Sequence, residues 1–197
     1  MKKIFLALSL VVTTLTASKS FAENIALAKA AELACHRIER LVALKKIDES
    51  FLNHLGTMVI VTQTKNQPTD PAFKVVASKY PGADGKMAQL ELMMDSQGKT
   101  LSFNVIAGSA SSPAPTWQDK DAVTLVENAL HYILEGWQGT NPAVQPFYDD
   151  LKSLRISQVK DASGLIISKV EFWSNRVATV LEVYLKLDGS FISAEVK

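Results

Sequence analysis

The hydrophobic and polar positions change along the chain from a helical period to a two-residue alternation. Apolar residues recur at helical spacing within 24–47, which predicts a long helix, and a shorter helix is predicted for 49–55. Apolar runs separated by Gly and Pro turns then predict strands. These strands are expected at 58–64, 73–80, 86–95 and 99–107.

The same order of elements returns after 108–119, a stretch rich in small residues and proline that is typical of a linker. A helix beginning within 116–121 and ending near Trp137 is followed by a short helix that opens at Asn141-Pro142. That short helix is expected to end near Lys152. Further strands are predicted at 154–161, 165–174, 178–187 and 190–196.

Residue types agree between the two halves as well as the order of elements. Phe51, Leu55, Met58 and Ile60 match, at equal spacing, Phe147, Leu151, Leu154 and Ile156. Agreement of order, spacing and identity favours an internal duplication over a chance match. The fold predicted is α+β, with tandem repeats at 23–107 and 120–197. Each repeat would be a long helix, a short helix and a four-stranded antiparallel meander. Whether the repeats share one sheet stays open.

This architecture resembles that of the β-lactamase inhibitor protein family. The ending strand–Asp188-Gly189–strand is also similar to the final hairpin of PepSY-type exported domains. The first resemblance implies a concave sheet surface that grips an enzyme. That family's repeats also carry disulfides, which a chain with the single cysteine Cys35 cannot form. The resemblance carries no binding motif over to particular residues.

The first 22 residues have the three parts of a cleavable secretory signal peptide. Lys2 and Lys3 precede the apolar run 4–12, and Ser20-Phe21-Ala22 places small residues where cleavage after Ala22 requires them. The alternative is a membrane anchor, but the run is much shorter than the roughly 20 apolar residues that span a bilayer. The mature chain is therefore expected to be periplasmic or secreted, with no later transmembrane segment.

Charge and cysteine content limit the possible partners. Loss of the leader removes three lysines and no acidic residue, so the formal net charge of +1 becomes slightly negative. Such a chain lacks the basic patch that nucleic acid or an anionic membrane requires, so neither is expected as a partner. Cys35 shares a helix face with Ala31 and Ile38 and is interpreted as a buried apolar residue, with an intermolecular disulfide or a reactive thiol as alternatives.

No motif predicts catalysis, a cofactor or a metal. His36, His54 and His131 are interpreted as partly exposed helix residues without metal-ligand partners on their own helices, and Asp149-Asp150 as a solvated face. A catalytic site assembled from distant residues stays open, but no residue is assigned to one. We therefore expect no enzyme activity.

Strand alternation predicts a set of outward-facing residues in the second half. Lys169 and Trp173 on one strand, Glu182 and Tyr184 on the next, and Phe191 on the last would share a solvent-facing surface. Aromatic anchors with a charged rim are typical of protein-binding patches. Trp117, at the end of the linker, either adheres to the domain surface or joins this patch. The alternative is that these aromatic residues pack against the other repeat or the linker.

These observations predict an exported, non-enzymatic binding module of the inhibitor, immunity or envelope accessory type. It would bind a protein of the cell envelope or outside through an open antiparallel sheet face. The alternative is a periplasmic carrier of a small apolar ligand or lipid, held in a cavity. Its lining could include Met58, Met87, Met93 and Met94.

Overall fold

The computed structural model describes residues 24–64, 70–81, 85–108, 117–137 and 139–197. The predicted leader at 1–22 and the greater part of the predicted linker lie outside the described residues. The elements are, in chain order, α1 (Leu27–Ala43), α2 (Ser50–Asn53), β1 (Leu55–Thr62), β2 (Phe73–Lys79), β3 (Gln89–Met94), β4 (Thr100–Ile106), α3 (Ala122–His131), the π-helix η1 (Tyr132–Trp137), α4 (Gln145–Asp149), β5 (Leu151–Lys160), β6 (Ile166–Ser174), β7 (Val180–Leu185) and β8 (Phe191–Val196).

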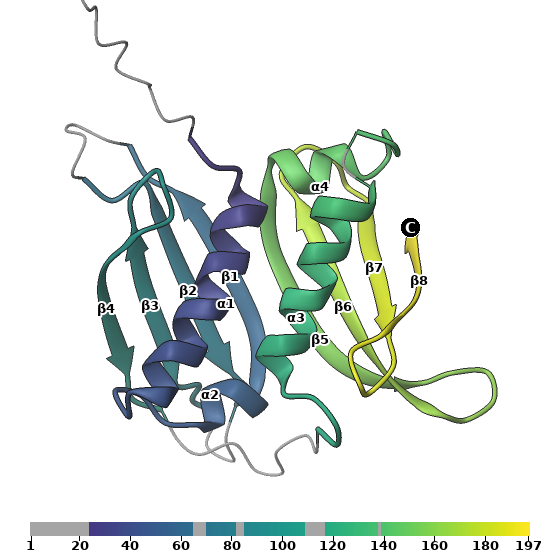
Figure 1. Cartoon of the computed structure of the whole chain (residues 1–197), viewed down its shortest axis with the longest axis horizontal. Helices are drawn as coiled ribbons and strands as arrows, with labels where there is room; N and C mark the ends of the chain where they lie inside the picture. Colours follow the sequence, from purple (N-terminus) through teal and green to yellow (C-terminus); the bar gives the residue numbers. More distant parts are fainter. Residues whose placement is uncertain (1–23, 65–69, 82–84, 109–116, 138) are drawn as a thin grey trace, which may run out of the picture.

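The strands form one eight-stranded antiparallel sheet in the order β4-β3-β2-β1-β5-β6-β7-β8 (Figure 1). The α+β prediction is confirmed, and the question of one sheet or two is settled. The first strands of the two halves, β1 and β5, pair with each other at the middle of the sheet. Met58 lies opposite Leu154 in that pairing, flanked by Thr57 opposite Arg155 and Val59 opposite Ser153.

The helices cover one face of the sheet, and the core lies between the two layers (Figure 1). Along β1 the side chains of Met58 and Ile60 are buried, whereas Val59 and Val61 are 36% and 50% exposed. This alternation is expected for a sheet that is covered on one side only. We call the face without helices the outer face.

The helix layer is built around α1 and α3, which pack side by side (Figure 1). Small residues such as Ala30, Ala34 and Cys35 are fully buried on α1, and their size permits close approach to neighbouring elements. At the start of α3 the Asp121 carboxylate accepts the Thr124 backbone N–H at 2.7 Å, which caps the helix. The sequence predicted one helix as far as Trp137, but the α-helical part ends at His131 and the chain continues as a π-helix.

The edge strand β4 leaves every side chain at least partly exposed, including the apolar Leu101, Phe103 and Val105. The opposite edge, β8, is also largely exposed. Within the described residues, none of the helices combines the length and the hydropathy needed to cross a membrane.

Candidate functional site

The outer face of β5 to β8 carries the largest part of the predicted binding surface. Lys169 pairs with Tyr184 across β6 and β7, and Glu171 pairs with Glu182. Trp173 lies on β6 two residues farther along the same face, and both aromatic residues are partly exposed. These side chains therefore share one face of the sheet, on which Lys169, Trp173 and Tyr184 are partly exposed, whereas Glu182, which the sequence placed facing solvent, is buried.

Alternating charges form a continuous ladder across these strands. Arg155 on β5 donates from Nε to Glu171 at 2.8 Å, and Lys169 lies 3.1 Å from both Glu171 and Glu182. The C-terminal Lys197 continues the ladder, with its Nζ 2.7 Å from both Glu182 and Glu195. We call these six residues the ladder: Arg155, Lys169, Glu171, Glu182, Glu195 and Lys197.

Two carboxylates of the ladder are buried although they lie on the helix-free face. Glu171 and Glu182 are 5% and 8% exposed. Burial alone would raise the pKa of Glu182, but hydrogen bonds from Lys197, Tyr184 and Lys169 outweigh burial and lower that pKa to about 2. The pKa of Glu171 is also lowered, because hydrogen bonds from Arg155 and Lys169 overcome its burial. Both side chains are therefore ionised and held in place at neutral pH.

The ladder also fixes the aromatic side chains. The Arg155 guanidinium lies 5.5 Å from the centre of the Trp173 ring, and the Lys197 ammonium lies 5.9 Å from the centre of the Tyr184 ring. Both are cation–π distances. The Tyr184 hydroxyl donates to Glu182 and also lies 3.3 Å from Glu195. The Tyr184 ring is thus held by a cation–π contact and by hydrogen bonds of its hydroxyl, and the Trp173 ring lies against the Arg155 cation.

Tyr80 connects this surface to the first half of the molecule. Its hydroxyl donates to the backbone carbonyl of Ile156 on β5, and burial raises its pKa to about 12. The ring lies against Gly56, where an added Cβ would come within 3.3 Å of it. The sequence predicted a helix at 49–55 and a strand from 58 onward, but β1 already begins at Leu55 and includes Gly56, where the absence of a side chain makes room for Tyr80.

The expected position of Phe191 on this surface is wrong. A bulge shifts the register of β8 between Tyr184 and Leu185, so that Phe191 lies opposite Leu185 and faces the helices. There its ring stacks on Tyr132 of η1, with the ring centres 3.5 Å apart and the planes 8° apart. The bulge inserts one additional residue into β8, and strict alternation counted back from Val196 could not reveal it.

Trp117 does not lie on the outer face either. It is partly buried against the hydrophobic core, and its indole N–H has no hydrogen-bond partner among the described residues. Of the two placements that the sequence left open, the structure has the one in which Trp117 adheres to the body of the domain.

Sequence reasoning missed several residues of this site. Arg155 could have been found, because it lies between the inward-facing Leu154 and Ile156 on β5. The contact of Lys197 with Glu182 could not be predicted, because Lys197 follows the last strand and Glu182 lies on the neighbouring strand β7. On the first half of the outer face, Lys74 and Glu91 form a further ion pair at 2.6 Å, beside the exposed Val59 and Val61.

The methionines proposed to line a ligand cavity do not lie together. Met58 and Met94 are fully buried in the core, whereas Met87 is 42% exposed. Met93 alternates with Met94 on β3 and therefore faces the opposite side.

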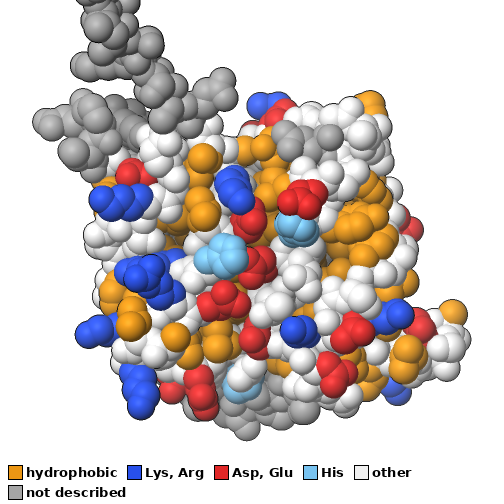
Figure 2. All heavy atoms as spheres, viewed as in Figure 1, with side chains coloured by type: hydrophobic (Ala, Val, Ile, Leu, Met, Phe, Trp, Pro, Cys, Tyr) orange, Lys and Arg blue, Asp and Glu red, His pale blue; other side chains and the backbone are white. Residues whose placement is uncertain are grey.

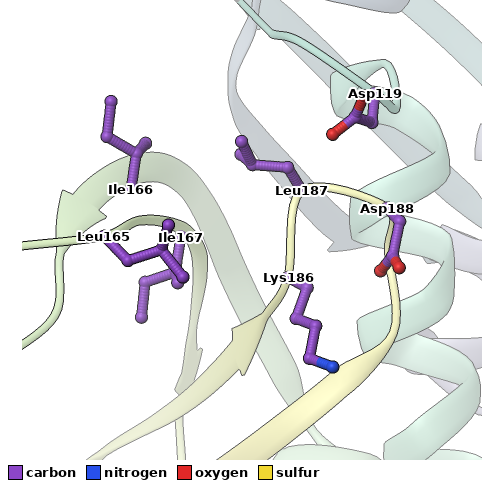
Figure 3. Close-up of a pocket in the computed structure, with 7 residues that line it drawn as sticks. All are labelled: Asp119, Leu165, Ile166, Ile167, Lys186, Leu187 and Asp188. Carbon is purple, nitrogen blue, oxygen red and sulfur yellow. The ribbon is translucent and has the colours of Figure 1, made fainter. Parts of the chain in front are cut away.

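An apolar hollow of about 220 Å³ lies elsewhere, between the end of the β5–β6 hairpin and the β7–β8 turn (Figure 3). In the figure Leu165, Ile166 and Ile167 lie on one side of it and Leu187 on the other. Small-molecule sites are typically about 300–1,000 Å³. The hollow is therefore small for a lipid.

Comparison with known proteins adds little to this geometry. No family model matches the chain. No curated protein matches it either. Among solved structures, one from Clostridium difficile 630 described as a "putative lipoprotein" aligns over 79% of this chain and 90% of its own, with 11% identity and a TM-score of 0.29. A similarity at this level supports no inference about fold or function.

Proposed function

We propose that this chain is an exported, non-enzymatic protein that binds another protein through the outer face of β5 to β8. The observation that carries the proposal is the ladder, which places a cation against each of Trp173 and Tyr184 and a carboxylate on the Tyr184 hydroxyl, on a helix-free surface. Ordering of interface side chains costs roughly 0.5–1.5 kcal/mol each, so a pre-ordered surface lowers the cost of binding. Partly exposed aromatic residues are also the side chains that most often dominate binding energy.

The partner is expected to be a folded protein of the cell envelope or the extracellular space. Export is part of the proposal and rests on the signal-peptide pattern at 1–22. In protein recovered from the envelope or medium, the N-terminal residue should be Glu23. An N-terminus at Met1 in such material would contradict the proposed cleavage.

The decisive experiment is affinity capture from an envelope extract with immobilised residues 23–197, compared with a W173A/Y184A variant. We expect one stoichiometric protein on the parent chain and at least tenfold less of it on the variant, because hot-spot aromatic residues each contribute about 2 kcal/mol or more. The matched control is L44A, which truncates a side chain that is 55% exposed just beyond α1.

Capture by L44A should equal that by the parent chain. Equal capture by the folded W173A/Y184A variant would show that the binding surface lies elsewhere. A co-purifying small molecule in native mass spectrometry, with no protein captured, would instead support the carrier alternative.

We also propose that the two halves descend from one duplicated unit. Buried residues occupy the matched positions, with Phe51 and Phe147, for example, both at most 2% exposed. The strand order runs outward from β1 and β5 in the same way on both sides. An alignment of relatives tests the idea. If the sequences of the two halves are no more similar to each other than to those of unrelated α+β units, the duplication is refuted.

A further inference from the structure

The helix-covered face carries a cluster that is separate from the outer face. Glu32 and His36 lie one turn apart on α1, and Glu127 approaches them from α3. One potential ligand atom from each of the three lies within 4.8 Å of the others. Figure 2 shows that histidine and acidic side chains gather near the middle of this face. We call these three residues the inter-helix cluster.

The side chains of the cluster differ in their access to solvent. Those of Glu32 and Glu127 are only 11% and 16% exposed, whereas that of His36 is 55% exposed. The site is therefore closed on the protein side by two carboxylates and open on the solvent side, next to an imidazole. A metal ion entering from solvent would meet His36 and could keep water in its remaining coordination position.

The imidazole of His36 is already oriented toward the cluster. Its Nε2 lies 2.6 Å from Glu127 Oε1, and its Nδ1 lies 3.6 Å from Glu39 Oε2. A carboxylate on the second ring nitrogen is the usual companion of a metal-binding histidine, and Glu39 lies near that nitrogen, just beyond hydrogen-bond distance. Lys29 is the competing cation, with its Nζ 2.5 Å from Glu32 Oε2. That contact is made to one oxygen of Glu32, so Lys29 would compete with a metal ion for this carboxylate.

We propose that Glu32, His36 and Glu127 bind a divalent transition metal of the zinc class, which joins α1 of the first half to α3 of the second. One imidazole and two carboxylates form a mixed nitrogen and oxygen ligand set. Zinc accepts such a set in tetrahedral geometry, whereas magnesium and calcium favour oxygen ligands alone. Cys35, although adjacent in sequence, is fully buried in the core and takes no part.

The bound metal would cross-link α1 and α3 in the helix layer. The site is independent of the outer face, so its failure would leave the proposed binding function untouched. A ligand that binds only the folded chain stabilises it in proportion to the logarithm of its concentration over its dissociation constant. Zinc should therefore raise the midpoint of thermal unfolding.

The test is isothermal titration of chelator-treated residues 23–197 with Zn²⁺, together with Co²⁺ absorption and thermal unfolding. The test variants are E127Q and H36Q. The matched control is H131Q, which alters an exposed pair between α3 and η1 in which His131 Nε2 lies 2.9 Å from Glu135 Oε2. We expect one zinc ion per chain for the parent and for H131Q, and at least tenfold weaker binding for E127Q and H36Q. The Co²⁺ spectrum should lack a thiolate charge-transfer band.

Two results would overturn the site. One is equal zinc affinity of the parent chain and E127Q, and the other is no binding by the parent at micromolar zinc. A thiolate band with Co²⁺ would also overturn this ligand set, because it would place the metal on Cys35. Circular dichroism of each variant without metal checks that it is folded.

Discussion

At the scale of single residues, the most informative side chain is Glu182. It is buried on a face without helices, and it receives hydrogen bonds from Lys169, Tyr184 and Lys197. Its position was predictable, because alternation along β7 places it opposite the core-facing Leu181 and Val183. Its ionic partners were only partly predictable. Lys169 follows from the same alternation, whereas Lys197 comes from beyond the last strand.

Glu182 should make stability depend on pH. Its pKa is about 2 in the folded chain and 4.5 in an ordinary environment, so its contribution is complete above about pH 4.5 and is lost as the pH falls toward 2. We expect E182Q to lower the free energy of unfolding by about 1–3 kcal/mol at pH 7, the usual worth of hydrogen bonds to a charged group. The difference from the parent chain should shrink on acidification through that window. Urea unfolding at several pH values measures it.

The matched control is E195Q. Glu195 lies directly opposite Glu182 in the β7–β8 pairing but is half exposed at the end of the ladder. Exposed ion pairs contribute about 0–1 kcal/mol, so E195Q should change little. An E182Q deficit that stays constant from pH 7 to pH 2.5 would contradict the assigned role of the carboxylate.

At the scale of elements, helical and two-residue periods predicted nearly every helix and strand, because most elements present an apolar face to the core. The predictions failed where a local irregularity changes the period. The bulge in β8 turned Phe191 from the outer face to the helix side, and the π-helix η1 ends the α-helical part of the third helix early. The interpretation that His36 has no metal-ligand partner on its own helix overlooked Glu32, four residues earlier on α1, and Glu127 joins this pair only because α1 and α3 pack together.

The N-cap of α3 gives a test of how the second half begins. Replacing Asp121 with alanine removes the 2.7 Å hydrogen bond to the Thr124 N–H. We expect D121A to lower the free energy of unfolding by about 0.5–2 kcal/mol, as other cap removals do. Chemical denaturation measures the change. D119A, two residues earlier at an exposed bend, should stay within about 0.5 kcal/mol of the parent. Equal losses in the two variants would show that the cap itself has no special role.

At the scale of the whole molecule, the decisive feature is the pairing of β1 with β5. Neither strand carries a sequence signal that selects the other, since any two strand edges can pair through their backbones. The sequence therefore left the number of sheets open. In the structure, this pairing and the Tyr80 hydroxyl bond to the Ile156 carbonyl make the two halves one body.

The two halves should accordingly unfold together. Trp137 and Trp173 lie in the second repeat and Trp117 lies just before it, so fluorescence reports mainly on that half, whereas far-ultraviolet circular dichroism reports on both. We expect coincident denaturation midpoints from the two probes, as two-state unfolding requires. Y80F should lower both midpoints equally, by an amount equivalent to about 1 kcal/mol for one hydrogen bond. Separate midpoints would show that the halves are independent units.

The ladder has a consequence for how a partner would arrive. Each of its cations already lies beside a carboxylate of the same chain, so little unbalanced charge extends into solvent from this face. Long-range steering accelerates association only where such a field exists, and added salt slows only association that is steered in this way. A partner docking on Trp173 and Tyr184 would therefore associate by diffusion without electrostatic steering. Its association rate constant would be nearly the same at low and at high ionic strength.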